Sequence, residues 1–301
     1  MAVGNPPASN AIVVCCTESW LPYAACALLS CARHAGALEV DYHVICLPCA
    51  QSSIDSFAAF LEAKGVSPKI HIATVPQEFA AIDMGRYTFA SLLRLLLDKH
   101  VPHHYERLLY LDCDVLACAS LAGVFSLDLT GKALGAVEDY LTMHAGQRYR
   151  SAHFEELGVP QPDRYFNSGV MLFDWKQTVA KGLLPRSAAE IATHCRNNRA
   201  FPLHDQDALN IAFREDWAPI ALAFNVTDID YTPSKPVVFR HYTTRVKPWG
   251  ETWIPGFGDA KARYAKLLAG GPWPKANAPF RKVWLAETLR GLGHRLRNGW
   301  F

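Results

Sequence analysis

Two acidic residues separated by one position, Asp112 and Asp114, are the side chains of this chain best suited to chemistry. They follow the apolar run of RLLYLDCDVL, residues 107–116, which predicts a strand buried on both faces. Side chains two positions apart in a strand share one side, so Cys113 should face the other way. Two neighbouring carboxylates repel each other unless a cation lies between them, and such oxygen ligands suit Mg²⁺ or Mn²⁺. The alternative is an ordinary turn after a strand, where Asp is common.

Arg94 lies in SLLRLLLDKH, a helical pattern in which leucine covers nearly the whole circumference. A buried guanidinium is costly unless it is paired, so Arg94 should contact an anion. The anion is a core Asp in a structural salt bridge, a bound phosphate, or the carboxylates of the metal site.

Two further segments predict a polar pocket. In YFNSGVMLF, residues 165–173, Asn167 and Gly169 precede an apolar strand, and glycine permits close approach of a ligand. In LHDQDALN, residues 203–210, Asp205 and Gln206 belong to a polar cluster at the start of an apolar helix. An ordinary turn would explain the first segment, and helix capping would explain one Asp of the second.

His241 follows a predicted strand in VVFRHYTTRVKPW, residues 237–249, and Lys247 lies six positions later. His241 is a candidate third metal ligand, and Lys247 is a candidate partner for a diphosphate. The alternative is a strand end with a solvated basic loop. An imidazole beside two carboxylates would shift the preferred metal toward Mn²⁺.

These residues must be positioned by alternating strands and helices. The predicted strands are Ala11–Cys16, Val40–Leu47, Lys69–Val75, Arg107–Leu111, Ala133–Val137, Gly169–Phe173 and Val237–Arg240. The predicted helices between the first four are Trp20–His34, Ser52–Lys64 and Thr88–His100. This alternation predicts an α/β fold with a mostly parallel sheet covered by helices on both faces. Ligands bind beyond the carboxyl ends of such strands, where Asp112 and Asp114 fall.

The chain has 301 residues, half of them apolar, which is enough for one large α/β domain or two modest ones. Its first residues have no basic segment and only a short apolar run, so no signal peptide or membrane span is predicted. Nine cysteines, mostly in apolar stretches, indicate reduced thiols and a cytoplasmic protein. Cys46-Leu-Pro-Cys49 lacks a second Cys pair, so we interpret it as structural rather than as a zinc or redox site.

The last residues, 281–301, carry a local positive charge on an amphipathic pattern with aromatic residues at both ends. A basic amphipathic helix of this kind typically lies on an anionic membrane surface; packing against the body is the alternative. A Pro- and Gly-rich stretch around Gly250–Pro279 predicts a loop-rich linker, so we divide the chain into residues 1–255 and 256–301. The basic residues are confined to this tail, which argues against nucleic-acid binding.

Together these motifs resemble family 8 glycosyltransferases, and in particular the bacterial lipooligosaccharide galactosyltransferases and glucosyltransferases. LYLDCDVL resembles the DxD strand of that family, YFNSGVMLF its Asn-x-Gly strand, HDQDALN its Asp-Gln-Asp helix, and HYTTRVKPW its His…Lys-Pro-Trp loop. The motifs extend from Ala11 to Trp249, over most of the chain. The basic, aromatic tail resembles the membrane-associating end of the same enzymes.

The resemblance implies a GT-A fold with a Rossmann-like nucleotide-binding part. It also implies transfer of a hexose from a UDP-sugar to a saccharide or glycolipid acceptor, with retention of configuration. The metal would be Mn²⁺, with Mg²⁺ possible, held by Asp112, Asp114 and His241. Residues implied in catalysis are Gln206, Asp205, Asp139 (in GAVEDY) and Lys247. Residues implied in binding the sugar nucleotide are Cys15, Thr17, Glu18, Arg94, Asp112, Cys113, Asn167, Asp205 and Lys247.

Two positions depart from the family pattern. After the first strand the family usually has an Asp that reads uracil, whereas this chain has Thr17 followed by Glu18. In the C-terminal loop Thr244 replaces the usual Gly, and its Cβ would lie where backbone approaches the phosphates. Both departures concern nucleotide binding and leave the metal ligands in place.

Two other function classes compete with this one. Asp112 followed by Asp114 also resembles the nucleophile loop of haloacid-dehalogenase-type phosphatases, although three predicted strands precede it here. A non-catalytic sugar-nucleotide-binding protein with the same fold is the third hypothesis. The resemblance leaves open galactose or glucose as the donor sugar, front-face or double displacement as the route, and the oligomeric state.

Overall fold

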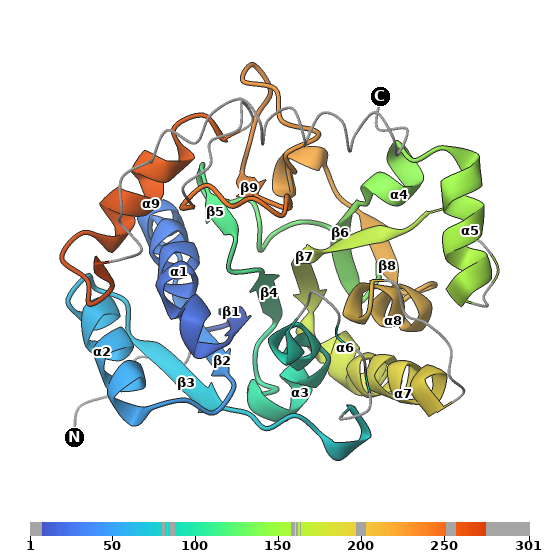
Figure 1. Cartoon of the computed structure of the whole chain (residues 1–301), viewed down its shortest axis with the longest axis horizontal. Helices are drawn as coiled ribbons and strands as arrows, with labels where there is room; N and C mark the ends of the chain where they lie inside the picture. The colour runs from blue at the N-terminus through green and yellow to red at the C-terminus, as the bar shows by residue number, and fades with distance from the viewer. Residues whose placement is uncertain are drawn as a thin grey trace.

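The computed structural model describes residues 8–79, 82, 84, 88–157, 160, 162, 164–196, 203–250 and 257–274. Its strands are β1 (Asn10–Cys16), β2 (Val40–Cys46), β3 (Pro68–Ile72), β4 (Arg107–Leu111), β5 (Val115–Ala117), β6 (Leu134–Glu138), β7 (Phe166–Asp174), β8 (Trp217–Pro219) and β9 (Phe239–His241). Seven of them form one sheet in the order β3-β2-β1-β4-β7-β6-β8, and β5 pairs with β9 in a separate ribbon (Figure 1). Within the sheet only β7 runs antiparallel to its neighbours, so the predicted mostly parallel α/β fold is confirmed.

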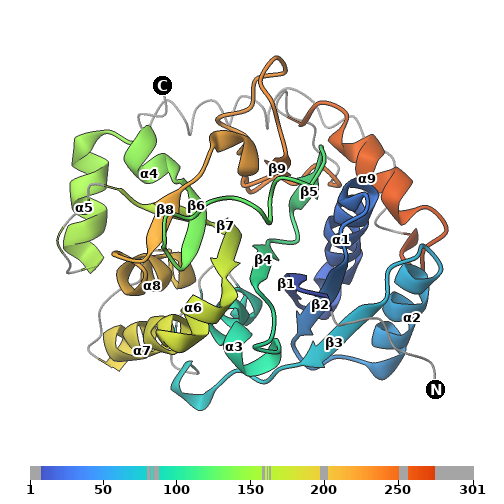
Figure 2. The same ribbon diagram turned by 180° about the vertical axis from the view of Figure 1, so that it is seen from behind.

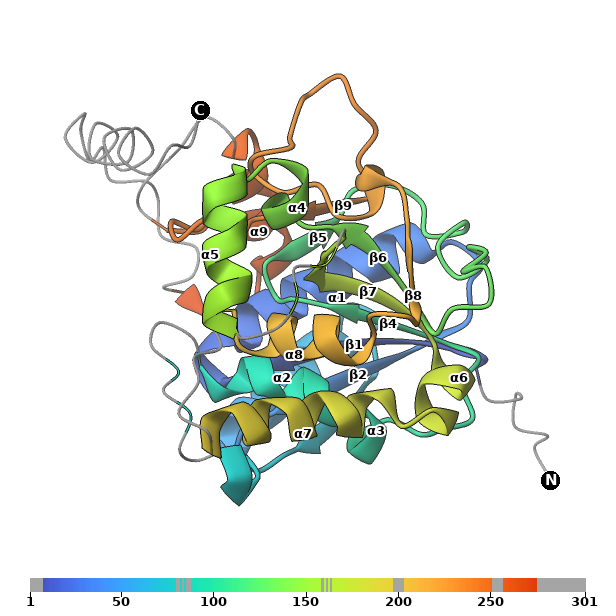
Figure 3. The same cartoon turned by 90° about the vertical axis from the view of Figure 1, so that its right-hand side faces the viewer.

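Helices cover both faces of the sheet. The α-helices are α1 (Leu21–Ala35), α2 (Gln51–Glu62), α3 (Leu97–His100), α4 (Tyr140–Met143), α5 (Gln147–Leu157), α6 (Trp175–Ala180), α7 (Leu183–Arg196), α8 (Asp205–Ala212) and α9 (Ala260–Leu268). Short 3₁₀ helices are η1 (Glu18–Trp20), η2 (Gln77–Phe79), η3 (Phe89–Leu96) and η4 (Leu222–Phe224). Helix α9 lies beside α1 in both the front view and the view from behind (Figure 2), and α7 lies beside α8 (Figure 3).

The two layers explain why β1 is continuously apolar. Ala11, Val13 and Cys15 belong to the hydrophobic core shared with η3, α7 and α8. Ile12 and Val14 belong to the opposite core, which includes α1, α2 and α9. Because successive side chains of a strand point to opposite faces, both faces of a strand covered in this way must be apolar.

The predicted elements mostly agree with the structure, and the differences concern short or irregular segments. Strand β7 begins at Phe166, three residues before the predicted start, so its polar residues belong to the strand rather than to a turn. The predicted helix Thr88–His100 was wrong in type over most of its length, because Phe89–Leu96 winds as a 3₁₀ helix before α3. Apolar periodicity of a few residues does not distinguish these two windings.

The predicted loop-rich stretch after Gly250 contains helix α9. Its residues Tyr264, Leu267 and Leu268 are buried in the same core as α1, so this helix is packed on the body of the protein. The predicted amphipathic tail, residues 281–301, lies outside the described residues. Among those that are described, no helix is long and apolar enough to cross a membrane.

The cysteines in the described part of the chain are free thiols, and most of them are buried. Cys46 and Cys49 place their sulfur atoms 3.9 Å apart without a disulfide. The prediction of buried thiols is therefore confirmed for most of these residues, Cys49 and Cys118 being only partly buried, and their reduced state stays a prediction.

His43 of β2 is a fully buried histidine that belongs to a separate hydrogen-bond network from the acidic motif. The Tyr105 hydroxyl donates to Asp41 (2.7 Å), so it accepts from Nε2–H of His43 (2.9 Å). Nδ1 of His43 then accepts from Nε2–H of His71 (3.0 Å). Burial, with His71 and Lys69 nearby, lowers the pKa of His43 from 6.5 to about 4. The ring is thus neutral in the folded protein at neutral pH.

Acid should therefore destabilise the protein through His43. Between pH 6.5 and 4 the unfolded chain binds more protons at this group than the folded protein, so this contribution to stability is lost as the pH falls. From pH 7 to pH 5 the loss from this group is about 2 kcal/mol of unfolding free energy. The unfolding free energy, measured with urea at pH 7 and pH 5, should fall by about 2 kcal/mol less in His43→Leu than in the original protein. An equal loss in the variant and the original protein would contradict the assignment.

Candidate active site

One edge of the sheet gathers the predicted site residues. The carboxyl ends of β4 and β6 meet there, and the antiparallel β7 brings its amino end to the same edge. Asp112 follows β4, Asp139 follows β6, and Asn167 is the second residue of β7. The backbone N–H of Asp112 donates to the carbonyl of Gly169 (2.8 Å), which ties the two strands together at this point.

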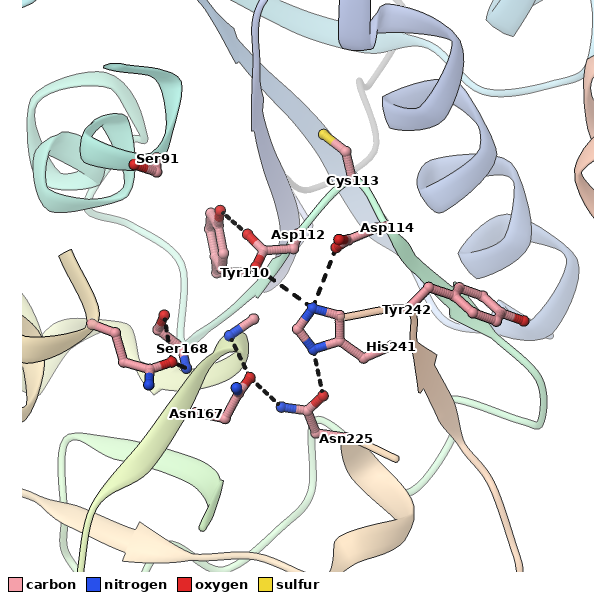
Figure 4. Close-up of polar contacts among 12 residues, drawn as sticks. Ser91, Tyr110, Asp112, Cys113, Asp114, Asn167, Ser168, Asn225, His241 and Tyr242 are labelled. Atoms are coloured by element: carbon pink, nitrogen blue, oxygen red, sulfur yellow. Dashed lines mark hydrogen bonds and ion pairs between the residues drawn. The ribbon is translucent and has the colours of Figure 1, made fainter. Parts of the chain in front are cut away.

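Asp112, Asp114 and His241 converge beyond this edge. Strand β4 ends at Leu111 and the chain turns tightly, with Val115 N–H donating to the Asp112 carbonyl (3.1 Å). Both carboxylates lie on the His241 side while Cys113 points away (Figure 4). The shared side is confirmed, although a turn rather than strand alternation produces it. His241 lies beside the two carboxylates because β9 pairs with β5, which places His241 opposite Val115.

The three side chains form a donor set that fits a divalent cation. Nε2 of His241 lies 3.3 Å from Oδ1 of Asp114 and 3.8 Å from Oδ2 of Asp112. One ligand atom from each residue lies within 4.8 Å of the other two. Two carboxylates and one imidazole suit Mn²⁺ and related ions. Gly169 borders the cluster, and a Cβ at that position would lie only 2.9 Å from Oδ2 of Asp112.

Arg94 is buried and paired with two carboxylates. Its Nη2 lies 2.7 Å from Oδ1 of Asp112, and its Nε lies 3.1 Å from Oδ2 of Asp205. Nη1 donates to the carbonyl and hydroxyl oxygens of Ser168, each at 3.0 Å. Burial alone would lower the pKa of Arg94, but the two carboxylates raise it well above its ordinary value. The predicted anionic partner is therefore the metal-site carboxylate, together with an Asp of α8.

Replacing Arg94 by methionine should strongly destabilise the protein. The substitution leaves the buried carboxylate of Asp205 and the partly buried carboxylate of Asp112 without their shared countercharge, and breaking a buried pair typically costs about 3–5 kcal/mol. Urea unfolding at pH 7 measures this loss. Arg263→Met is a matched control, because Arg263 forms an exposed pair with Asp259 and exposed pairs contribute at most about 1 kcal/mol. Equal losses in the two variants would contradict the buried-pair interpretation.

Lys247 lies at the side of the cluster away from Arg94. Its ammonium group is 2.7 Å from Oδ2 of Asp114. Burial would raise the pKa of Asp114, but the Lys247 ammonium beside it holds the pKa well below its ordinary range. Asp114 is therefore ionised, as a metal ligand must be.

Further polar side chains lie beside the cluster and hydrogen-bond to one another. Asn167 Nδ2 donates to Oδ2 of Asp139 (2.8 Å), whose Oδ1 caps α4 by accepting from Leu141 N–H (2.9 Å). Burial raises the pKa of Asp139, and the hydrogen bond from Asn167 partly offsets this. Gln206 accepts from the backbone N–H of Ser168 (3.0 Å) through its amide oxygen. The structure thus brings Asp139, Asn167 and Gln206 to one wall beside the three candidate ligands.

The second acid of the Asp-Gln-Asp segment has a structural role. Asp207 is fully buried and accepts hydrogen bonds from His153, Tyr165 and the backbone N–H of Leu203, at 2.6–2.8 Å. These partners satisfy the carboxylate within the protein. Asp205, by contrast, faces Arg94 in the candidate site.

The four remaining predicted nucleotide contacts lie at the end of β1 or directly after β1 and β4. Thr17 and Glu18 come directly after β1, at the same sheet edge, and Glu18 accepts a hydrogen bond from the Ser53 hydroxyl. The Cys15 and Cys113 thiols are buried, and Cys113 donates to the Cys15 carbonyl (3.3 Å). Thiols buried in this way are structural, so any contact of these two residues with a nucleotide would come from their main chain.

Two residues of the site were missed in the sequence. Tyr110 donates to Oδ1 of Asp112 (2.7 Å), and its ring lies under the Arg94 guanidinium, 4.8 Å from ring centroid to Cζ. Strand alternation could have indicated Tyr110, which is two positions before Asp112. Asn225 accepts from Nδ1 of His241 (2.9 Å), and it follows η4 in a segment with no recognisable pattern.

Comparison with known proteins agrees with this geometry. The family model for glycosyl transferase family 8 matches residues 11–252. General stress protein A of Bacillus subtilis is 30% identical over 48% of this chain and 50% of its own length. Lipopolysaccharide 1,2-glucosyltransferase of Escherichia coli is 29% identical over 69% of this chain and 62% of its own. The chain thus spans about half to two thirds of these two relatives.

The fold also matches a solved structure of the same type. A crystal structure of the galactosyltransferase LgtC with donor and acceptor sugar analogs superimposes with a TM-score of 0.71 and 21% identity, covering 94% of this chain and 99% of that one. The phosphatase alternative has no support, because the acidic motif follows the fourth strand and the family model spans most of the chain. The chain therefore belongs to glycosyl transferase family 8.

Proposed function

We propose that this protein transfers a hexose, galactose or glucose, from a UDP-sugar to a saccharide acceptor with retention of configuration, and that it depends on a divalent metal. The observation that carries this proposal is the cluster of Asp112, Asp114 and His241 within 4.8 Å of one another. Lys247 and Arg94 flank the cluster on opposite sides. A site with this distribution of charge suits a sugar diphosphate.

The three clustered side chains would hold Mn²⁺, or Mg²⁺. When bound, the ion supplies Lewis-acid stabilisation of the negative charge on the departing diphosphate. Lys247 adds a second positive charge at the same place, since its ammonium already lies at the edge of the cluster. Charges placed in advance where charge develops are the main source of rate acceleration in such transfers.

The polar wall would bind the donor sugar. Within this wall Arg94 forms an ion pair with Asp205, and Asn167 donates a hydrogen bond to Asp139. Side chains that are already hydrogen-bonded lose little further entropy when a sugar hydroxyl binds to them. Gln206 lies between the two pairs, anchored through Ser168, and would lie near the anomeric carbon.

The acceptor is proposed to be a glycan of the lipopolysaccharide type. The similarity to a lipopolysaccharide glucosyltransferase supports this class of acceptor. Residues 1–255 would carry the transferase site, and the basic tail of residues 281–301, within the C-terminal part 256–301, would bring the enzyme from the cytoplasm to the inner face of the cell membrane.

An assay of UDP release tests the proposed function. The protein is incubated with UDP-galactose or UDP-glucose, with Mn²⁺ or with a chelator, and we expect metal-dependent UDP release from one of the two donors. Release of phosphate from small phosphomonoesters without turnover of either donor would overturn the proposal in favour of a phosphatase. Donor binding without turnover, in the presence of saccharide acceptors, would identify a non-catalytic binding protein.

A further inference from the structure

We propose that Asn225 is a positioning residue that holds the imidazole of His241 in the tautomer with its proton on Nδ1, so that Nε2 presents a lone pair to the cluster of carboxylates. The proposal rests on the proposed metal site, and it concerns the residue behind the ligand rather than the ligands themselves. It follows from a chain of hydrogen bonds that begins at a backbone N–H and ends at His241 (Figure 4).

The first step fixes the orientation of Asn167. The backbone N–H of Gly169 can only donate, and it lies 3.0 Å from the side-chain oxygen of Asn167. The other end of this amide must therefore be the NH₂ group. It points at Oδ2 of Asp139, 2.8 Å away, where the NH₂ group donates and the carboxyl oxygen accepts.

The second step fixes the orientation of Asn225. Its side chain lies 2.8 Å from the oxygen of Asn167, so it must donate there through Nδ2. Its oxygen then faces Nδ1 of His241 at 2.9 Å. An amide oxygen accepts only, so Nδ1 of His241 carries a proton, and in the neutral ring Nε2 carries none. A metal-binding histidine requires this arrangement.

The loop that bears Asn225 is held firmly. Asn225 is fully buried, and its N–H donates to the carbonyl of Leu222 (3.0 Å). The next residue, Val226, exchanges backbone hydrogen bonds with β9: its N–H donates to Phe239 and its carbonyl accepts from His241, each at 2.9 Å. The main chain thus sets the distance between Asn225 and His241.

Asn225 disfavours the other neutral tautomer of His241, in which the proton is on Nε2. With its proton on Nε2, His241 would donate to Oδ1 of Asp114, 3.3 Å away. That proton would occupy the lone pair that a metal needs. Since Asn225 offers only an oxygen to Nδ1, the competing tautomer would leave two acceptors facing each other at 2.9 Å. The proposed tautomer instead places the Nε2 lone pair 3.3 Å from Oδ1 of Asp114, and a cation bound between these two atoms would remove that repulsion. The same chain of bonds links Asn167, a proposed donor-sugar contact, to a proposed metal ligand.

Two substitutions at this position separate its acceptor and donor functions. Asn225→Leu removes the acceptor, and we expect the dissociation constant for Mn²⁺, measured by electron paramagnetic resonance, to rise about 10- to 100-fold. Asn225→Asp keeps an acceptor for Nδ1–H, so its Mn²⁺ affinity should stay within a few-fold of the original. Thr178→Val is the matched control, because it removes another buried hydrogen bond, from Oγ1 to the Ala133 carbonyl, on the far side of β7.

The tautomer of His241 can be measured directly by NMR in the metal-free protein. Long-range ¹H–¹⁵N spectra of histidine-labelled protein, at a pH where the ring is neutral, should show the Nδ1–H form for His241, assigned by loss of its peaks in His241→Gln. Asn225→Leu should shift it toward Nε2–H, and Asn225→Asp should not.

The Nε2–H form in the original protein, or unchanged Mn²⁺ affinity in a folded Asn225→Leu, would overturn the proposal. If Asn225→Leu does not fold, the spectrum of the original protein and the Mn²⁺ affinity of Asn225→Asp still test the proposal. A large loss of Mn²⁺ affinity in Asn225→Asp would contradict it. Failure of the original protein to bind Mn²⁺ would instead refute the proposed metal dependence, and the spectrum would still report the tautomer.

Discussion

Replacing His241 by alanine should abolish metal-dependent sugar transfer. His241 supplies the only nitrogen of the candidate donor set in the described part of the chain, and it comes from strand β9, far along the chain from the two carboxylates that lie between β4 and β5. Substitution of a residue behind a metal ligand typically costs about 10- to 100-fold in affinity or activity, so loss of the ligand itself should exceed about 100-fold.

UDP release and Mn²⁺ binding, each measured over a range of Mn²⁺ concentrations, test this expectation. His103→Ala is the matched control, since His103 is exposed and its ring hydrogen-bonds to the nearby carbonyl of Asp98 (2.8 Å). Full Mn²⁺-dependent activity in His241→Ala would require withdrawal of the metal-site assignment, including that of Asp112 and Asp114. Loss of activity together with loss of folding, seen by circular dichroism, would point to a structural role.

Adding a single methyl group at Gly169 should damage the site almost as severely. A Cβ there would lie 2.1 Å from Cε1 and 2.7 Å from Nδ1 of His241, and 2.9 Å from Oδ2 of Asp112. Carbon atoms do not approach other heavy atoms this closely without a shift. The imidazole cannot move aside easily, because it is buried and hydrogen-bonded to Asn225. We therefore expect Gly169→Ala to weaken Mn²⁺ binding by about 100-fold.

The same substitution should cost about 1–3 kcal/mol of unfolding free energy, the usual cost of overpacking. Gly123→Ala is the control, because a Cβ there meets no atom within 4 Å. Urea unfolding and Mn²⁺ titration of both variants provide the comparison. Normal Mn²⁺ affinity in Gly169→Ala would show that the site tolerates a displaced imidazole, and would argue against a metal site built around His241.

Much of the sheet could be predicted because its strands are buried on both faces. Continuous apolar runs such as Ile12–Val14 and Leu108–Leu111 have no other explanation in a chain of this composition, and β1 and β4 are found where they were expected. Helix α1 agrees for a similar reason, since Pro22 marks its first turn and Gly36, with φ of +62°, follows its last residue. Local residue preferences determine these boundaries.

Other elements could not be predicted, because their own residues show no pattern typical of a strand or of a particular helix type. Strands β5 and β8 have three residues each, too few for an alternation to be recognised. Both exist because a neighbouring strand offers hydrogen bonds: β9 for β5, and β6 for β8. The 3₁₀ winding of η3 could not be predicted either, because its apolar pattern also fits an α-helix. Arg94 of η3 is paired with Asp112 and Asp205, which are distant in the sequence.

By itself, the sequence determined the kinds of groups available to the site and the parts of it that are close along the chain. The spacing of Asp112 and Asp114 already placed two carboxylates together, because one intervening residue leaves them little freedom to separate. Their joining with His241 was decided by the pairing of β5 with β9, and the involvement of Asn225 by the bonds between Val226 and β9. Hydrogen bonds and metal ligation act over about 3 Å, and only the tertiary structure brings residues from distant parts of the chain within that distance.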